Sequence, residues 1–263
     1  MLHAILACVG CALADPSTAA GGAVAVDVEL VLAVDASRSM DENELALQRA
    51  GYAAALSDPA FAAAVRSGVH GRIALTYFEW SDDVHEASRV AWRIVDGPES
   101  AAAFAAAIPT GEPRRTLGTS ISTALAHAAG LFEGNGFAGG RRVVDVSGDG
   151  PNNKGPAVDL ARDVLVADGI VVNGLPILVS PSRTFPDLDR YYAECVAGGP
   201  GSFVLPANGI AEFATAIRRK LILEVSGVPP PPITVSLRGP VDCAKGERDD
   251  RFAPDPDLDG TDE

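Results

Sequence analysis

The sequence has few residues of the kinds that bind zinc. It holds four cysteines and four histidines among 263 residues, and beyond the N-terminal segment only Cys195 and Cys243 remain, with no histidine near either. Two isolated cysteines do not make a zinc site. They could form one disulfide in an oxidising compartment, or both could stay free, and their spacing does not decide between these alternatives.

Basic charge is also scarce, and two longer patterns are missing. The formal net charge of −14 argues against nucleic acid and anionic membrane surfaces as partners, and it favours cations or basic surfaces. After the N-terminus no stretch of about 20 apolar residues occurs, so no transmembrane helix is expected. No G-x-G-x-x-G follows the first predicted strand, which argues against a dinucleotide-binding enzyme.

The N-terminal segment has the pattern of a secretory signal. An apolar run ends in Ala12-Leu-Ala14, which matches an A-x-A cleavage site and predicts a signal peptide over residues 1–14. The segment before that run carries no Lys or Arg, so a start codon further upstream is an alternative. A lipoprotein at Cys8 or Cys11 is another, although neither cysteine has a convincing apolar box before it. We therefore expect a periplasmic or secreted protein.

The remaining chain alternates between strand and helix patterns. Strands are expected at 26–34, 72–80, 87–95, 141–147, 169–173 and 202–205, and helices at 42–56, 60–66, 98–108, 119–132, 156–167, 187–196 and 210–225. This alternation predicts an α/β fold with a doubly wound, mostly parallel sheet, and the strands at 72–80 and 87–95 form an antiparallel edge hairpin. In the first helix Gln48 and Arg49 are expected on the exposed side.

Past Gly227 the composition changes. Four prolines at 229–232 predict a stiff extended segment, and residues 238–263 are rich in Asp, Pro and Gly, which predicts disorder. We expect a domain over residues 25–226, followed by a Pro-rich linker and an acidic tail over 227–263.

One short loop groups oxygen-bearing side chains. Asp35-Ala-Ser-Arg-Ser39 follows the first predicted strand and precedes a helix, and ligands bind at such carboxyl ends of strands in α/β sheets. Asp and Ser offer hard oxygen donors, which suit magnesium, calcium or manganese rather than zinc. The alternative is a helix cap in which Ser39 or Asp41 accepts hydrogen bonds from free helix amides.

Two later loops supply more oxygen donors. Thr119 follows Gly118 at the start of a predicted helix, and Asp149 lies just beyond the strand that ends near Ser147. If the strands before Asp35 and Asp149 are central and adjacent, their carboxyl ends meet at one crevice. Five side chains would then supply about the oxygen count of an octahedral Mg²⁺ shell, with water completing it. They are Asp35, Ser37, Ser39, Thr119 and Asp149.

This pattern resembles the metal-ion-dependent adhesion site (MIDAS) of von Willebrand factor type A (vWA) domains. Asp-x-Ser-x-Ser at 35–39, Thr119 after Gly118, and Asp149 in Ser-Gly-Asp-Gly at 147–150 match its three loops in order. The resemblance spans about residues 25 to 226. Within the fold, the stretches at 142–153 and 191–201 resemble an uncharacterised bacterial subfamily, which brings no known activity with it.

The resemblance implies a three-layer αβα fold and an adhesion or protein-interaction role rather than an enzyme. The five residues would hold Mg²⁺, with Mn²⁺ or Ca²⁺ as alternatives, and an acidic residue of a partner protein would complete the metal shell. Gly148 and Gly150 would let the backbone fold close around the ion. Asp145 departs from the pattern, since a carboxylate within a strand is costly when buried; we expect it to pair with Arg141 or Arg142, or else to support the site.

Two rival interpretations remain. One is an interaction module of the same fold with an idle metal site or a partner surface elsewhere. The other is a serine hydrolase, because Asp35, His70 and Ser120 stand in the chain order of subtilisin-like proteases. Only about 50 residues separate His70 from Ser120, which is too few for the sheet that those enzymes place between them.

Overall fold

The computed structural model describes residues 22–40, 42–111, 116–178, 185–227 and 239–248. The predicted signal peptide, the four-proline run and residues 249–263 lie outside these ranges. In chain order the elements are β1 (Val24–Asp35), α1 (Glu42–Leu56), α2 (Pro59–Arg66), β2 (Ile73–Trp80), β3 (Val84–Val95), α3 (Pro98–Ala105), α4 (Ile121–Leu131), β4 (Phe137–Gly148), α5 (Val158–Ala167), β5 (Ile170–Pro176), α6 (Leu188–Tyr191), the π-helical turn η1 (Tyr192–Val196) and α7 (Ile210–Ser226).

The strands form one sheet in the order β3-β2-β1-β4-β5. β1 pairs parallel with both β2 and β4, and β4 pairs parallel with β5, whereas β2 and β3 pair antiparallel. The predicted fold class is therefore confirmed, including the antiparallel hairpin at one edge. β1 and β4 are central neighbours in register, with Val34 opposite Ser147.

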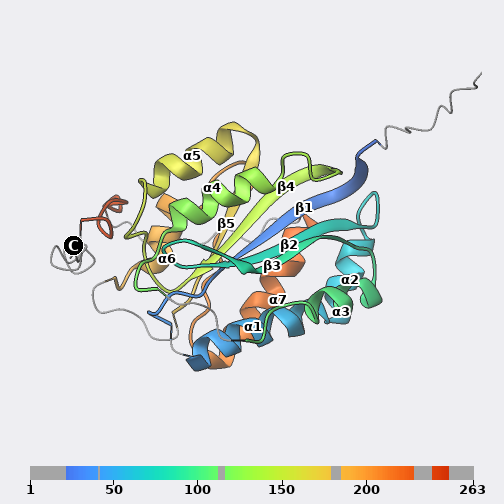
Figure 1. Ribbon diagram of the computed structural model, residues 1–263, viewed down its shortest axis with the longest axis horizontal. Coiled ribbons are helices and arrows are strands. Elements are labelled where there is room, and N and C mark those ends of the chain that lie inside the picture. The colour runs from blue at the N-terminus through green and yellow to red at the C-terminus, as the bar shows by residue number, and fades with distance from the viewer. Residues whose placement is uncertain (1–21, 41, 112–115, 179–184, 228–238, 249–263) are drawn as a thin grey trace, which may run out of the picture.

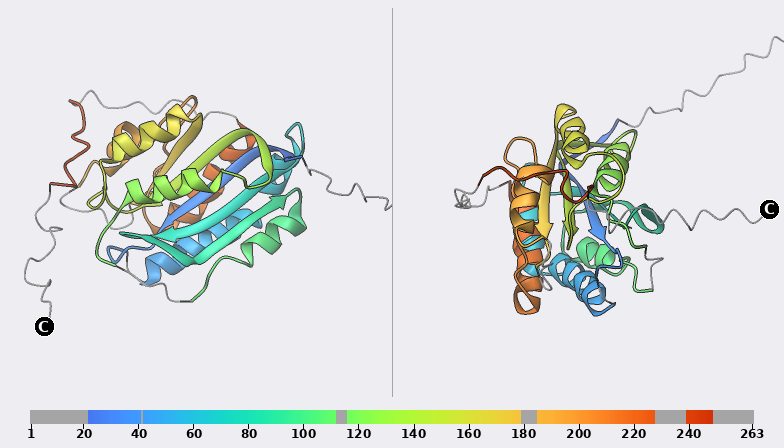
Figure 2. Two further views of the ribbon diagram at one scale, coloured as in Figure 1. Left: turned by 45° about the horizontal axis from the view of Figure 1, so that its top comes forward. Right: turned by 90° about the vertical axis from the view of Figure 1, so that its left-hand side faces the viewer.

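Helices cover both faces of this sheet (Figures 1 and 2). Alternate side chains of β1 point to opposite faces, because successive residues of a strand do so. Leu30 and Leu32 lie in the apolar cluster that includes residues of α1, α2, α3 and α7. Val31 and Ala33 lie in the cluster that includes residues of α4, α5, α6 and η1. The result is the expected three-layer αβα arrangement.

The predicted strand at 202–205 is wrong. Within this range only Val204 makes a bridge, an isolated one to Gly174 of β5. Glycines with positive φ at 199 and 201 precede the segment and Pro206 follows it, so its backbone is too irregular for a ladder. The helix predicted at 187–196 is split into α6 and η1.

The expected disorder of the tail does not hold for residues 239–248. They form a short turn that is joined to η1 by a disulfide between Cys195 and Cys243, whose Cα atoms are 5.5 Å apart. Of the two states that the sequence left open for these cysteines, a disulfide or two free thiols, the structure has the disulfide. Across the described residues, no helix is both long and apolar enough to cross a membrane.

Candidate metal centre

The candidate site lies where the two central strands end. Asp35 is the last residue of β1, and Asp149 directly follows Gly148, the last residue of β4. Since β1 and β4 are adjacent and parallel, their carboxyl ends lie at the same edge of the sheet. The topology thus brings the first and third predicted loops together.

Hydrogen bonds join four of the five predicted residues. Asp35 Oδ1 accepts a bond of 2.7 Å from the Ser37 amide. The hydroxyls of Ser37 and Ser39 are 2.8 Å apart, and Ser39 Oγ donates to Asp149 Oδ1 at 2.7 Å. Ser39 therefore uses its hydroxyl within the cluster, while Asp41, the other candidate helix cap, lies outside the described residues.

Thr119, on the second loop, is tied to the loop that carries Asp149. Its amide donates to Asn153 Oδ1 at 2.8 Å, and the Asn153 amide donates back to the Thr119 carbonyl at 2.8 Å. A Cβ atom added at Gly150 would lie 4.0 Å from Thr119 Oγ1, so this hydroxyl faces the residue after Asp149. Thr119 precedes α4, whose N-cap is Ser120, so the helix begins two residues later than predicted. The structure brings all five predicted residues to one edge of the sheet.

Asp35 is the most unusual member of this cluster. It is 0% exposed, and its Oδ2 atom has no hydrogen-bond partner among the described residues. Burial, together with the neighbouring Asp149 charge, raises the pKa of the Asp35 carboxyl to about 8. A buried carboxylate oxygen beside hydroxyl oxygens and a second carboxylate fits a hard divalent cation, which would hold Asp35 ionised.

The backbone at Gly148 approaches this carboxylate closely. A Cβ atom there would lie 2.8 Å from Asp35 Oδ2 and 2.6 Å from the hydroxyl of Tyr192. Gly148 is therefore required by close approach, as expected, whereas Gly150 has room for a side chain. Burial and the charges of Asp35 and Asp149 raise the pKa of Tyr192 well above its usual value, so its phenol stays neutral beside the two carboxylates.

Two residues of α1 were expected to be exposed but are buried, and one of them supports the site. Gln48 is fully buried, and its Nε2 donates to the Asp35 carbonyl at 2.8 Å. Arg49 is buried too and pairs with Glu79 of β2, with 2.7 Å between Nε and Oε1. The expected exposure of both is wrong. Ala46, Ala50 and Ala54 of α1 are exposed, so the apolar pattern does not mark its buried face.

Asp145 is paired within the fold, but with a different partner from the one expected. Lys220 of α7 lies with Nζ 2.8 Å from Asp145 Oδ1 and 2.6 Å from Glu224 Oε1. The guanidinium groups of Arg141 and Arg142 instead donate to the carbonyls of Glu224 and Asp168. Burial raises the pKa of Asp145 to about 6, against the opposing effect of Lys220.

The geometry separates the three residues of the hydrolase interpretation. The His70 amide donates to Asp27 Oδ1 at 2.9 Å, which places His70 near the amino end of β1. Asp35 lies eight residues further along β1, a span of about 26 Å at 3.3 Å per residue. Ser120 caps α4 by accepting a bond from the Thr123 amide. These residues cannot form a triad.

Hydroxyl groups are a necessary part of any cation site at this edge. Among the described residues, no three His, Cys, Asp or Glu side chains gather as a metal site. The two carboxylates of Asp35 and Asp149 need the oxygens of Ser37, Ser39 and Thr119 to complete a shell.

Known proteins resemble this chain in fold. A family model described as "Protein of unknown function (DUF1194)" matches residues 25–229. No curated protein matches the chain in sequence. Solved structures with similar folds include proximal thread matrix protein 1 (PTMP1) from the mussel byssus with a zinc-occupied MIDAS motif, at TM-score 0.56 and 19% identity. They also include the pilus adhesin SpaC from Lactobacillus rhamnosus GG, at 0.56 and 14%, and von Willebrand factor type A from Catenulispora acidiphila, at 0.52 and 15%.

These likenesses concern part of each larger protein. The alignments cover 78%, 78% and 76% of this chain, but only 49%, 31% and 43% of the three solved chains. The chain thus spans half or less of the length of each. At such identities the comparison shows the fold alone, which is vWA-like.

Proposed function

We propose a function from the premise that this chain belongs to the DUF1194 family. The chain has a vWA-like fold. It binds one divalent cation at the edge of its sheet and uses that ion to bind a protein. The residues that hold the ion are Asp35, Ser37, Ser39, Thr119 and Asp149. The chain acts as an adhesion or interaction module, in keeping with the adhesin and matrix proteins that share its fold.

One observation carries the proposal. Asp35 Oδ2 is buried without a hydrogen-bond partner among the described residues, although hydrogen bonds join Asp35 Oδ1 and the side chains of Ser37, Ser39 and Asp149 around it. A buried carboxylate left in this state costs several kcal/mol unless its charge is compensated. A divalent cation supplies that compensation, whereas a helix cap does not.

The donor chemistry favours Mg²⁺, with Mn²⁺ and Ca²⁺ as alternatives, because all five side chains offer hard oxygen atoms. Zinc belongs in the same test, since it occupies the motif in the PTMP1 structure. With only two carboxylates around it, the ion keeps positive charge and open coordination positions. An Asp or Glu side chain of a partner protein is the ligand that suits it.

The disulfide supports a location outside the cytoplasm. Disulfides persist in the periplasm and in secreted proteins but are rare in the cytosol. Together with the N-terminal signal pattern, the Cys195–Cys243 bond favours a periplasmic or secreted protein.

Titration calorimetry with Mg²⁺, Mn²⁺, Ca²⁺ and Zn²⁺ tests the cation. We expect the unaltered chain to bind Mg²⁺ or Mn²⁺, and Asp35→Ala and Ser37→Ala to lose binding. Ser67→Ala is the matched control, because Ser67 follows α2, its hydroxyl donates to the Ala64 carbonyl within the same turn, and it lies outside the site. Absence of binding by the unaltered chain, or equal binding by Asp35→Ala, contradicts the proposal and leaves the alternative of an interaction module with an idle site.

A further inference from the structure

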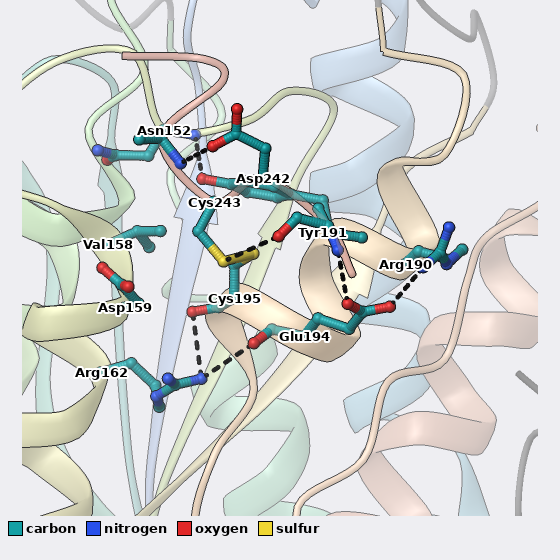
Figure 3. The surroundings of a disulfide bond; sticks show 12 residues. Asn152, Val158, Asp159, Arg162, Arg190, Tyr191, Glu194, Cys195, Asp242 and Cys243 are labelled. Atoms are coloured by element: carbon teal, nitrogen blue, oxygen red, sulfur yellow. Dashed lines mark hydrogen bonds and ion pairs between the residues drawn. A yellow bond between two sulfur atoms is a disulfide. The ribbon is translucent and has the colours of Figure 1, made fainter. Parts of the chain in front are cut away.

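The tail segment at residues 239–248, called here the C-terminal strap, lies at the same end of the molecule as the candidate cation site. Figure 1 shows it in red beside α6 and the start of α5. The disulfide from Cys243 to Cys195 fixes it to η1 (Figure 3). The same turn carries Tyr192. No motif in the sequence assigns this segment a role.

Polar contacts hold the strap in addition to the disulfide. The Val241 amide donates to Glu194 Oε2 at 2.8 Å, and Arg190 Nη2 donates to the Gly239 carbonyl at 2.7 Å. Arg190 and Glu194 are themselves an ion pair at 2.8 Å (Figure 3). Since the strap is held at several points, the position of its remaining residues is defined relative to the fold.

Glu247 extends from the strap into the loop that follows Asp149. Its Oε1 atom accepts one bond from Asn152 Nδ2 at 3.0 Å and one from the Val158 amide at 3.2 Å. Val158 is the first residue of α5, whose own N-cap residue makes no side-chain bond, so Glu247 caps this helix from a distance. A Cβ atom at Gly246 would lie 2.3 Å from the Asn152 carbonyl, so only glycine permits this approach.

Asn152 connects the strap to the candidate site. It is fully buried, and its Oδ1 accepts from the Ser122 amide at 3.1 Å, near the start of α4. Its backbone amide donates to the Tyr191 hydroxyl at 3.1 Å. The next residue, Asn153, is the one that holds the Thr119 amide. Asn152 therefore joins the Asp149 loop to the helix that follows Thr119.

Two acceptors fix which way the Asn152 amide points, because Asn152 Nδ2 donates to the Pro156 carbonyl and to Glu247 Oε1 at 3.0 Å each. A carboxylate only accepts hydrogen bonds, so the NH₂ group of Asn152 must face Glu247, and the carbonyl oxygen must face the Ser122 amide. The reversed amide would place two oxygens against each other and two donors against each other. Glu247 thus favours, together with the Pro156 carbonyl, the one orientation in which Asn152 ties the loops of the site together.

We propose that Glu247, held in place by the disulfide-anchored strap, is a positioning residue for the cation site. It acts through Asn152 to keep the Asp149 and Thr119 loops in the arrangement that binds the ion. This inference rests on the proposed cation binding. It implies that the tail is part of the functional domain rather than a solvated extension.

Mn²⁺ titration of single variants tests the inference in the full chain. Glu247→Ala is expected to weaken Mn²⁺ binding about tenfold, the usual effect of losing a group that orients metal ligands. Glu133→Ala is the matched control, since Glu133 is exposed in the turn after α4. The Cys195→Ser/Cys243→Ser double variant is expected to weaken binding in the same direction. A strap that merely stabilises the fold would lower the melting temperature and leave the Mn²⁺ affinity of the folded protein unchanged, which would overturn the proposal.

An exchange of groups between the two residues separates positioning from packing. Asn152→Asp sets a carboxylate against that of Glu247 and is expected to weaken Mn²⁺ binding more than Glu247→Ala does. Adding Glu247→Gln to Asn152→Asp supplies an NH₂ donor from the other side and should restore part of the affinity. No restoration overturns the orientation argument.

Amide hydrogen exchange without any metal tests Glu247 apart from the proposed function. In Glu247→Ala the amides of Ser122 and Thr119 are expected to exchange faster, whereas exchange in the centre of β1 should not change. If the unaltered chain binds no Mn²⁺ but this exchange effect is present, the proposed function fails and the positioning of the loops by Glu247 stands. Unchanged exchange at both amides overturns the role of Glu247 whatever the metal results are.

Discussion

At the scale of single residues, the site combines one carboxylate that the fold buries with several hydroxyls that cost little to bury. Asp35 is fully enclosed, whereas Ser39 is exposed and Asp149 is partly exposed. Asp35 is thus the residue whose charge most needs a cation, and the others are placed around it by short hydrogen bonds. Any group that enters the space beside Asp35 Oδ2 should disturb the site.

A substitution at Gly148 tests how tightly the space beside Asp35 Oδ2 is filled. Gly148→Ala would bring a methyl group within 2.6 Å of the Tyr192 hydroxyl and 2.8 Å of Asp35 Oδ2. Overpacking of this kind lowers the free energy of unfolding by about 1–3 kcal/mol, and here it should also weaken Mn²⁺ binding. Urea denaturation and Mn²⁺ titration measure the two effects.

Gly150→Ala is the control for that change, because its nearest contact would be Thr119 Oγ1 at 4.0 Å. It should alter the free energy of unfolding by no more than about 0.5 kcal/mol. Adding Tyr192→Phe to Gly148→Ala removes the closest contact and should recover part of the lost stability. Equal losses for the two glycine variants would contradict the close approach at Gly148.

The individual ligand candidates could be predicted from sequence, but their supporting residues could not. Asp35 and Asp149 each end or directly follow a buried strand, and such positions are recognisable from the chain alone. Gln48 and Tyr192 reach the site from a helix and a π-helical turn whose rotation depends on packing against the sheet. Nothing local in their sequence marks them as neighbours of a carboxylate.

At the scale of elements, one buried ion cluster ties α7 to the sheet. Lys220 is fully enclosed between Asp145 of β4 and Glu224 one turn along α7, and it also lies 4.8 Å from the centre of the Phe203 ring. Asn173 of β5 donates to Glu224 Oε2 at 2.7 Å, so the cluster spans two strands and a helix. Removing its single cation would leave two carboxylates buried together.

Lys220→Met should therefore destabilise the fold strongly. Breaking a buried ion pair by removing one partner costs about 3–5 kcal/mol, because the remaining charge stays buried without compensation. Arg219→Met is the matched control, since the neighbouring Arg219 side chain is exposed, and its effect should stay within about 0.5 kcal/mol. Urea denaturation of both variants gives the comparison. A loss below about 1 kcal/mol for Lys220→Met would show that the carboxylates protonate or rearrange at little cost.

Alternation of strand and helix patterns predicted the parallel sheet and its edge hairpin, because each buried strand is a compact apolar run. The pairing of Asp145 could not be predicted in the same way. Two arginines stand close to it in sequence, yet their strand directs them to other partners, while Lys220 comes from a helix packed across the sheet. An ion pair between a strand and a helix of the next layer depends on the tertiary arrangement, which the residues neighbouring Asp145 in sequence do not reveal.

At the scale of the whole molecule, the tail was the part that composition described least well. Its Asp, Pro and Gly content is typical of disorder, but a disulfide and a partly buried carboxylate contact can order a short segment without an apolar core. Cysteine spacing alone did not show which state the two thiols adopt. Residues well beyond α7 are therefore joined to η1 and to Asn152, in the loop that follows Asp149.

The acidic character of the chain bears on how it would recognise a partner. With a net charge of −14, the chain repels an exposed acidic side chain of another protein at long range, and the proposed cation would offer that side chain an attractive contact at the site. A basic partner, in contrast, would be attracted to the acidic surface without any metal. These two modes of binding respond in opposite ways to salt and to chelator.

We therefore expect partners captured from cell-envelope extract by the metal-loaded chain to remain bound at about 0.5 M NaCl, where the Debye length is about 4 Å and surface attraction is screened. EDTA should release them, and Mn²⁺ should restore capture, because the metal forms the contact itself. Asp35→Ala used as bait should capture none of the chelator-sensitive proteins. Partners that resist EDTA but are lost in salt would instead show that the acidic surface, and not the cation, makes the contact.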